Sequence, residues 1–342
     1  MTQDYKIYGA ELSPYSVKVR SFFRFKKIPH KWIIRNQSNA KDFQKFARLP
    51  IVPLVVTPDL QGLQDSTPIM DYFEENYPEI KTNPERQPLN FLSYLLEEYS
   101  DEWGNKQMFH YRWKDKVDQK SAALRIAENN LPTYIKYLPI VNSIMKNQAS
   151  KIIQNRMSQR LWVIGSNEVT ENQICDSYEE LLSLLEAHLS ERTYIFGERP
   201  SFADFGLWGQ IYNSWTDPTP RKFIEKKYKG MLPWINEMMD PKMKGDFEVW
   251  ETLSSTLMPI LKEQVGKVFL PWSDAVTKSM EKESDEVSIL IKGKEFTHSL
   301  GGPQKYHVKS LKVLRNRFQE IKDQEDLKDI LSEANCLEYL IT

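Results

Sequence analysis

Ser13 is the first residue in this sequence whose type and position could support chemistry. It follows a short run with strand character, Ile7–Ala10, and precedes Pro14, which suits the first turn of a helix because that position needs no backbone N–H donor. A hydroxyl at such a turn lies beside free N–H groups and the positive end of the helix dipole, which together stabilise an anion. A serine here is most often an ordinary N-cap, so the surrounding elements decide whether Ser13 does more.

The elements that would position Ser13 can be read from residues 14–76. The helix after Pro14 carries an apolar stripe on helical spacing, and the basic residues on its other side are Lys18, Arg20, Arg24 and Lys26. We expect the cluster of Arg20, Arg24, Lys26, Lys27 and Lys31 to be the solvent-exposed face of this helix. His30–Ile34 reads as a second strand. The apolar run that contains Val52 and Pro53 reads as a third, and a proline at the entrance of a core strand favours a cis Val52–Pro53 bond.

A fourth strand and another helix complete residues 1–80. Leu63–Gln64 follows a turn and can pair back as a short antiparallel strand. Asp65–Pro68 carries helix-start signals, and the helix runs from Ile69 to Asn76, before Pro78. The predicted order is therefore βαβ followed by ββα.

Three motifs in this region together resemble the thioredoxin-like N-terminal domain of the cytosolic glutathione S-transferase (GST) family. Residues 13–20 are similar to the family's active-site turn in its serine-type, zeta-like version. Residues 51–55 match the cis-proline strand, and residues 64–72 match the Gln-Glu/Asp-Ser segment that opens the third helix. Each motif alone is weak, but their order and spacing make the resemblance specific. It implies a thioredoxin-like α/β glutathione-binding domain over residues 1–80.

The rest of the chain is predicted to be mainly helical. A polar linker, Lys81–Gln87, precedes a helical pattern over residues 88–265, which resembles the all-α C-terminal domain of the family. Ser201 and Asp204 form an S-x-x-D capping box there, with a folding role only. Most family members end soon after this domain, whereas here residues 266–342 continue as a small α+β extension.

The extension is expected to contain a hairpin that turns at Lys292–Gly293 and an amphipathic helix over Tyr306–Ile321. We expect it to pack on the helical domain. Two alternatives are that it caps the active cleft or forms a subunit interface.

The resemblance implies that Ser13 activates the thiol of glutathione, a co-substrate, for attack on a small apolar electrophile. A thiol titrates near 8.5, and each unit by which its pKa falls requires about 1.4 kcal/mol of preference for the thiolate. A hydroxyl hydrogen bond and a helix N-terminus can contribute that much. Tyr15 could instead donate its phenol, and Ser16 is a further alternative. The family's cysteine-type thiol-reductase route is closed, because residues 1–80 contain no cysteine.

The resemblance also assigns binding roles. Val52, before Pro53, would pair with the glutathione backbone like an added strand. Asp65 would bind the γ-glutamyl ammonium, and Ser66 with its helix N-terminus would bind a carboxylate. The ordinary alternatives are a surface acid and a helix cap.

A second-substrate pocket is expected between the domains, with Tyr15, Tyr99 and Trp103 in its wall. Aromatic residues at helical spacing are, however, more often plain core. The spacing of the two cysteines, Cys175 and Cys336, supports no metal motif. Glu98, Asp101, Glu102 and His110 could act as metal ligands, but the resemblance gives no support for this, and we expect a solvated acidic face and no metal.

Composition limits the partners. A net charge of -1 and a pI near 6.6 indicate neither nucleic acid nor a membrane as a partner. Two distant cysteines favour the reducing cytoplasm. The family implies a homodimer and a detoxifying transferase. Two alternative functions are a non-catalytic scaffold of the same fold and a glutathione-dependent isomerase or dehalogenase.

Overall fold

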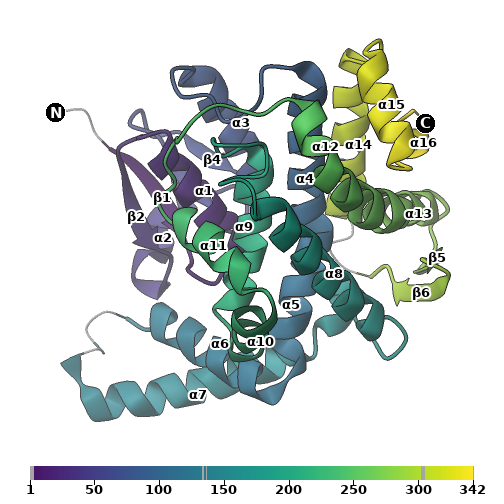
Figure 1. The fold of residues 1–342 in the computed structure, drawn as a ribbon. Helices are drawn as coiled ribbons and strands as arrows, with labels where there is room; N and C mark the ends of the chain where they lie inside the picture. The colour runs from purple at the N-terminus through teal and green to yellow at the C-terminus, as the bar shows by residue number, and fades with distance from the viewer. Residues whose placement is uncertain (1–3, 133–134, 136, 302–304, 342) are drawn as a thin grey trace.

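The structure is a computed structural model that describes residues 4–132, 135, 137–301 and 305–341. A four-stranded sheet with helices forms the N-terminal part, and helices make up most of the remainder (Figure 1). A small two-stranded sheet lies near the C-terminus. The predicted fold class, a thioredoxin-like domain, a helical domain and a small α+β extension, is confirmed.

The N-terminal sheet has the order β2-β1-β3-β4, with β1 parallel to β2 and the other pairs antiparallel. Its elements are β1 (Tyr5–Gly9), α1 (Pro14–Phe25), β2 (His30–Ile34), η1 (Gln37–Asn39), α2 (Ala40–Gln44), β3 (Leu54–Val56), β4 (Gly62–Gln64) and α3 (Ser66–Asn76). Parallel β1 and β2 are joined through α1, as a parallel pair requires a crossover connection.

The helical domain begins with α4, which continues through a π-helical turn into α5. Its elements are α4 (Gln87–Tyr99), η2 (Ser100–Gly104), α5 (Asn105–Lys114), α6 (Lys116–Asn130), α7 (Pro139–Ser158), η4 (Leu161–Ile164), α8 (Glu171–Leu189), α9 (Phe202–Trp215), α10 (Pro218–Lys227), η5 (Lys229–Met231), α11 (Leu232–Glu237), α12 (Trp250–Ile260), η6 (Leu261–Phe269) and α13 (Leu270–Glu281). The capping box of Ser201 and Asp204 starts α9, with Asp204 Oδ2 accepting hydrogen bonds from the Ser201 N–H and hydroxyl at 2.9 and 2.8 Å.

The extension contains β5 (Glu286–Ile291), β6 (Lys294–Ser299), α14 (Lys305–Glu320), α15 (Glu325–Glu333) and α16 (Leu337–Leu340). Lys292 and Gly293 connect the two strands with φ angles of 49° and 78°. This left-handed pair is the geometry of a tight hairpin turn. Because α12, η6 and α13 run without a break from Trp250 to Glu281, the predicted boundary at residue 265 falls inside a helical run.

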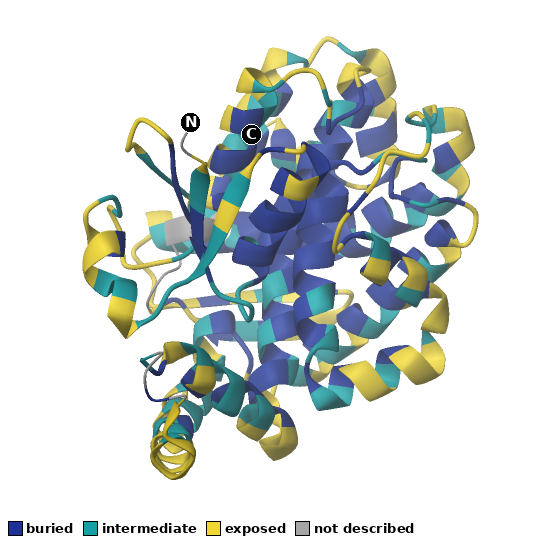
Figure 2. Ribbon diagram, turned by 90° about the vertical axis from the view of Figure 1, so that its left-hand side faces the viewer, coloured by how far each residue is buried: buried dark blue, intermediate teal, exposed yellow. Residues whose placement is uncertain are grey.

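One hydrophobic core runs through all three parts of the chain. It includes Phe22 of α1, Leu96 of α4, Trp272 of α13 and Leu311 of α14. Buried residues concentrate in the central helices, and exposed residues lie at the periphery (Figure 2). No helix of the described chain is long and apolar enough to span a membrane.

Candidate active site at the open end of the sheet

Three strand ends bring the predicted site residues to the same edge of the N-terminal sheet. Tyr8 of β1 lies opposite Leu54 of β3, which in turn lies opposite Gln64 of β4. Beyond these positions β1 leads into the turn with Ser13 and β4 leads to Asp65, while the residues just before β3 are Val52 and Pro53. The sheet register therefore gathers these predicted residues at one end.

Ser13 is the N-cap of α1. Its Oγ accepts a hydrogen bond from the Ser16 N–H at 3.2 Å, and its backbone is extended. The cap uses only the acceptor capacity of the hydroxyl, and among the described residues Ser13 donates its own proton to no acceptor. Ser13 is half-buried, so this proton is available to a ligand at the start of α1.

Val52 presents an unpaired backbone edge. The Val52–Pro53 peptide bond is cis, as predicted. Within the described part of the chain neither the N–H nor the C=O of Val52 forms a hydrogen bond, because β3 begins only at Leu54. The neighbouring loop is held instead by Gln64, whose side chain bonds the Arg48 and Leu49 N–H groups and the carbonyls of Leu49 and Ile51. An extended peptide could therefore pair with Val52 as an additional strand.

Asp65 precedes α3 in a backbone conformation that non-glycine residues rarely adopt, with φ at 80°. Such outliers concentrate at functional sites because the surrounding structure has to hold them in place. The Asp65 carboxylate is exposed and forms an ion pair with Lys309 of α14, with 3.0 Å between Nζ and Oδ2. The extension thus reaches the edge where the predicted site residues meet.

Ser66 is buried beneath this edge. Its Oγ lies 3.4 Å from Nζ of Lys18 and 3.3 Å from Oδ2 of Asp101, so the hydroxyl faces the interior. The N-cap residue of α3, Asp65, forms no side-chain capping hydrogen bond within the described part of the chain. The backbone N–H groups of Ser66 and Thr67 at the start of α3 can therefore bind an anion.

Lys18 is the main residue that sequence reasoning missed. The prediction that the basic cluster of α1 faces solvent is wrong for Arg20 and Lys26, which are only 8 and 5% exposed, and Lys18, which the predicted helix places opposite the apolar stripe, is 1% exposed. The Lys18 ammonium is bonded to the carboxylates of Glu97 and Asp101, the latter at 2.7 Å. Burial alone would lower the pKa of Lys18, but these two carboxylates raise it above its usual value, so the side chain stays charged.

The signal that could have revealed Lys18 is its position between Val17 and Val19, inside the apolar stripe of α1. Its partners lie in α4 and η2, about 80 residues further along the chain, so no local sequence pattern indicates the pairing.

The two alternative hydroxyls near Ser13 are engaged or enclosed. The Tyr15 hydroxyl donates to the backbone carbonyl of Asp101 at 2.9 Å. Burial, together with the nearby Asp101 carboxylate, raises the pKa of Tyr15 well above its usual value. Ser16 is fully buried, and its Oγ has no hydrogen-bond partner among the described residues. Of the three hydroxyls, Ser13 is the one with both exposure and a free proton.

Tyr99 and Trp103 are fully buried in the helical core. The Tyr99 hydroxyl donates to Gln264 at 2.9 Å, and the Trp103 indole N–H donates to Ser177 at 2.9 Å. The Trp103 ring packs against Trp272 of α13 and Phe296 of β6, the latter in the extension. These contacts favour a core role for both aromatic residues, on the side of the helical domain that faces the extension.

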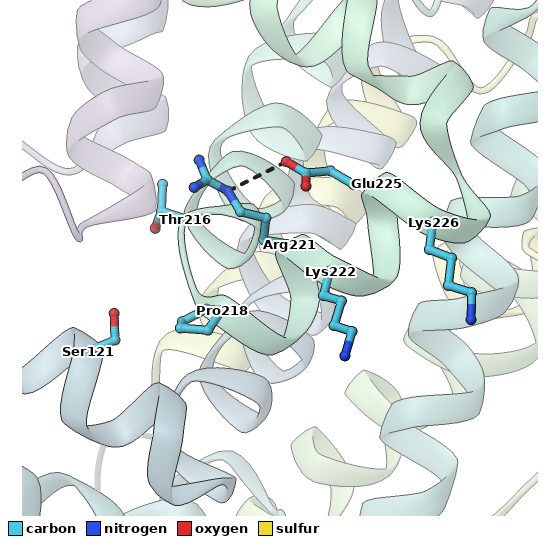
Figure 3. A pocket seen from close by; sticks show the side chains of 7 residues that line it. All are labelled: Ser121, Thr216, Pro218, Arg221, Lys222, Glu225 and Lys226. Atoms are coloured by element: carbon cyan, nitrogen blue, oxygen red, sulfur yellow. Dashed lines mark ion pairs between the residues drawn. The ribbon is translucent and has the colours of Figure 1, made fainter.

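Two cavities lie away from the strand ends. The larger, about 570 Å³, is lined by Ser121, Thr216, Pro218, Arg221, Lys222, Glu225 and Lys226 (Figure 3). There Arg221 pairs with Glu225, and the side chains of Lys222 and Lys226 point away from Ser121. The smaller, about 90 Å³, lies beside Trp103 and Ser177. Among the residues that the structure describes, no group of three or more His, Cys, Asp or Glu could hold a metal ion.

Comparison with known proteins matches two segments of the chain. Residues 7–84 match the family model of the glutathione S-transferase N-terminal domain. Residues 167–237 match the model of the glutathione S-transferase C-terminal domain. This is the two-domain fold of the glutathione S-transferases. The segments 85–166 and 238–342 of this GST-like chain lie outside both matches, and they include the α6–α7 hairpin and the extension.

Solved GST structures resemble the chain at low identity. A glutathione S-transferase from Methylobacillus flagellatus with bound glutathione is 16% identical, with 69% of this chain and 95% of that chain covered and a TM-score of 0.39. A glutathione transferase from Phanerochaete chrysosporium is 14% identical, with 73% and 100% covered and a TM-score of 0.45. A search of curated proteins found no match.

Proposed function

We propose that the chain binds glutathione at the open end of the N-terminal sheet and activates its thiol for attack on a small apolar electrophile. The observation that carries this proposal is the unpaired backbone of Val52, which lies at the same end of the sheet as Ser13 and Asp65. A tripeptide whose cysteinyl unit pairs with Val52 as an added strand would direct its thiol toward Ser13 and its γ-glutamyl end toward Asp65.

Ser13 is proposed as the activating residue, in the manner of the serine-type, zeta-like enzymes. Its hydroxyl accepts the cap hydrogen bond and keeps its proton for the glutathione sulfur. The N-terminus of α1 adds a partial positive charge next to the same sulfur. Both effects favour the thiolate, and neither needs a cysteine or a metal ion.

Asp65 and the start of α3 are proposed to bind the polar groups of glutathione. The exposed Asp65 carboxylate suits an ammonium, and the uncapped backbone N–H groups that begin with Ser66 suit a carboxylate. The buried Ser66 hydroxyl has a supporting role, because it joins α3 to Lys18 of α1. Pro53 keeps the Val52 edge open by delaying the start of β3.

Tyr15 remains the proposed wall residue for the electrophile, since it borders Ser13 and is held by Asp101. Tyr99 and Trp103 are less suited to line such a pocket, because both side chains are fully buried. By analogy with the family, we further propose a cytoplasmic homodimer with a role in detoxification.

One observation favours a second function, a non-catalytic scaffold of the same fold. Lys309 already supplies a cation to the Asp65 carboxylate, and neither cavity described above is lined by Ser13, Val52 or Asp65. In a scaffold, the extension would close this edge permanently.

Isothermal titration with glutathione separates the two functions. The unmodified chain should bind glutathione, and Asp65→Ala should weaken binding about tenfold or more, whereas Ser38→Ala, an exposed control in the same domain, should bind unchanged. Failure of the unmodified chain to bind would overturn the enzymatic proposal in favour of the scaffold.

Difference absorbance of bound glutathione tests the activating hydroxyl. Ser13→Ala should still bind the tripeptide but lose the thiolate band at neutral pH. An unchanged band would reject Ser13 and leave the binding site itself intact.

A further inference from the structure

Helix α7 presents an exposed apolar face that no other part of the described chain covers. Ile140 and Ile152 are 76% and 68% exposed, and the other large apolar side chains exposed in or just before this helix are Tyr137, Leu138, Val141, Ile144 and Met145. In Figures 1 and 2, α7 lies at the edge of the molecule beside α6, away from the central helices. Contiguous apolar exposure of this kind marks an interaction surface in a water-soluble fold.

The helix geometry places these apolar residues on one side. Ile140, Val141, Ile144 and Met145 repeat at three- and four-residue spacing, and Ile152 follows seven residues after Met145, two helical turns along the same side. Residues of the other side, such as the buried Ser150, face the body of the protein, where α7 packs on α6. We call the exposed side, with Tyr137 and Leu138, the α7 face.

The α7 face lies within a stretch of uniform charge. From Asn129 to Asn167 the sequence contains no Asp or Glu, and its basic residues are Lys136, Lys146, Lys151, Arg156 and Arg160. Lys151, Arg156 and Arg160 are exposed, and among the described residues none of them forms an ion pair. The chain as a whole has 47 acidic and 46 basic residues, so this local excess is not a property of the whole chain.

Lys151 and Arg156 border the apolar residues of the α7 face. With about 100° per residue, Lys151 follows Ile144 by seven positions and Arg156 follows Ile152 by four, so each lies next to an exposed isoleucine. An apolar strip flanked by cations is the arrangement of helices that lie in the interface of anionic bilayers.

We propose that the α7 face binds the surface of an anionic lipid bilayer, with the apolar side chains inserted among the acyl chains and Lys151 and Arg156 at the headgroups. A second copy of the chain fits the same face poorly, because a two-fold contact would place its unpaired cations against each other. A flat bilayer also accepts a projecting helix, whereas protein partners usually bind such a helix in a groove.

This inference is independent of the proposed glutathione chemistry. It departs from the expectation drawn from the net charge of -1, since electrostatic attraction to lipids acts within about a Debye length and depends on local charge. Binding at the surface requires no membrane-spanning helix.

Vesicle flotation of the full chain tests the proposal. The chain should float with vesicles of phosphatidylcholine and phosphatidylglycerol, and should not float with phosphatidylcholine alone. In the triple variant Ile140→Ser, Ile144→Ser, Ile152→Ser the bound fraction should fall roughly tenfold or more. In the double variant Lys151→Gln, Arg156→Gln the bound fraction should fall by a similar factor, and the remaining binding should no longer depend on salt. Leu290→Ser on β5, with the same 68% exposure as Ile152, serves as the matched control and should bind unchanged.

Three results would overturn the proposal. One is that the unmodified chain fails to float with anionic vesicles. Another is that both α7 variants float as well as the unmodified chain. The third is a concentration-dependent dimer in sedimentation equilibrium that the triple variant abolishes, since this would identify the α7 face as an interface between copies. Unchanged circular dichroism and thermal unfolding of the variants would show that the fold is intact.

Discussion

Nζ of Lys309, in helix α14 of the extension, lies 3.0 Å from Oδ2 of Asp65 at the start of α3. Both side chains are about half exposed, so the pair lies at the surface of the site and not in the core. Helix α14 is fixed in this position by further contacts: Arg317 forms a partly exposed ion pair with Asp71 at 2.6 Å and lies over the Tyr94 ring, and the buried Ser310 hydroxyl donates to Glu98. Lys309 therefore already pairs with the carboxylate that the ammonium of glutathione is proposed to bind.

Replacing Lys309 should strengthen glutathione binding. In Lys309→Ala the Asp65 carboxylate loses its intramolecular cation, so the ligand no longer competes with it, and the Kd should fall about two- to fivefold, the range for one exposed ion pair. Titration calorimetry measures the change. Lys312→Ala, another exposed lysine of α14, should leave the Kd unchanged. Weaker binding in Lys309→Ala would mean that Lys309 contacts glutathione directly.

Replacing Lys18 should strongly destabilise the fold. Lys18→Met leaves Glu97 and Asp101 buried without their cation, and breaking a buried pair by removing one partner typically costs about 3–5 kcal/mol. The double variant Lys18→Met, Glu97→Gln should be more stable than Lys18→Met by at least about 1 kcal/mol, because the second substitution removes one of the two uncompensated carboxylates. Urea denaturation gives both values.

The exposed Lys41 provides the control for Lys18. Lys41→Met should change the free energy of unfolding by no more than about 0.5 kcal/mol. Equal stability of Lys18→Met and the unmodified chain would contradict the role of the buried cluster.

What could be predicted from the sequence depended on local signals. Pro14 and Ser13 marked the start of α1, and Lys292–Gly293 marked a hairpin turn, because each is determined by neighbours within a few residues. The position of Lys18 between Val17 and Val19 is a local signal of its burial, but its ion pairs could not be predicted, since its partners Glu97 and Asp101 come from another domain.

Long-range contacts also determine which residues of the extension lie at the site. Lys309 and Asp65 are 244 positions apart, and no sequence pattern around either residue predicts that they pair. Helix periodicity likewise cannot separate core aromatics from pocket aromatics. Tyr99 and Trp103 have the spacing of a pocket wall, but their hydrogen bonds to Gln264 and Ser177 are visible only in the folded chain.

The close approach of α9 to α1 gives a third prediction. A Cβ on Gly209 would lie 2.8 Å from the Pro14 carbonyl oxygen and 3.3 Å from Cβ of Lys18. Gly209→Ala should therefore destabilise the chain by about 1–3 kcal/mol and weaken glutathione binding, since it displaces the first turn of α1 beside Ser13. Gly104→Ala is the matched control because its Cβ would meet nothing closer than 3.4 Å. Thermal unfolding and titration with glutathione separate the two variants, and equal behaviour would contradict the prediction.

His188 should make the stability of the chain depend on pH. The side chain is fully buried between α8 and α12, where Nδ1 lies 2.8 Å from the Thr256 hydroxyl and Nε2 lies 2.8 Å from the Ile195 carbonyl. A carbonyl can only accept, so Nε2 carries the proton and Nδ1 accepts from Thr256. Burial lowers the pKa of His188 to about 4, and the neighbouring Arg192 acts in the same direction.

Because the pKa of His188 is lower in the folded than in the unfolded chain, the unfolded chain binds more protons between about pH 4 and pH 6.5. The free energy of unfolding should therefore fall as the pH decreases through this window, by up to about 3 kcal/mol from this residue. His110, whose pKa burial also lowers to about 4, should contribute a similar amount, whereas Asp101 and Asp204, whose pKa values burial raises to about 7 and about 6, act in the opposite direction. His188→Gln should therefore reduce the slope by the contribution of His188 alone. Thr256→Val should lower the stability at every pH yet keep the slope, because the imidazole still titrates. Urea denaturation at several pH values measures these slopes. An undiminished slope in His188→Gln would show that the His188 imidazole already binds its second proton, on Nδ1, in the folded chain.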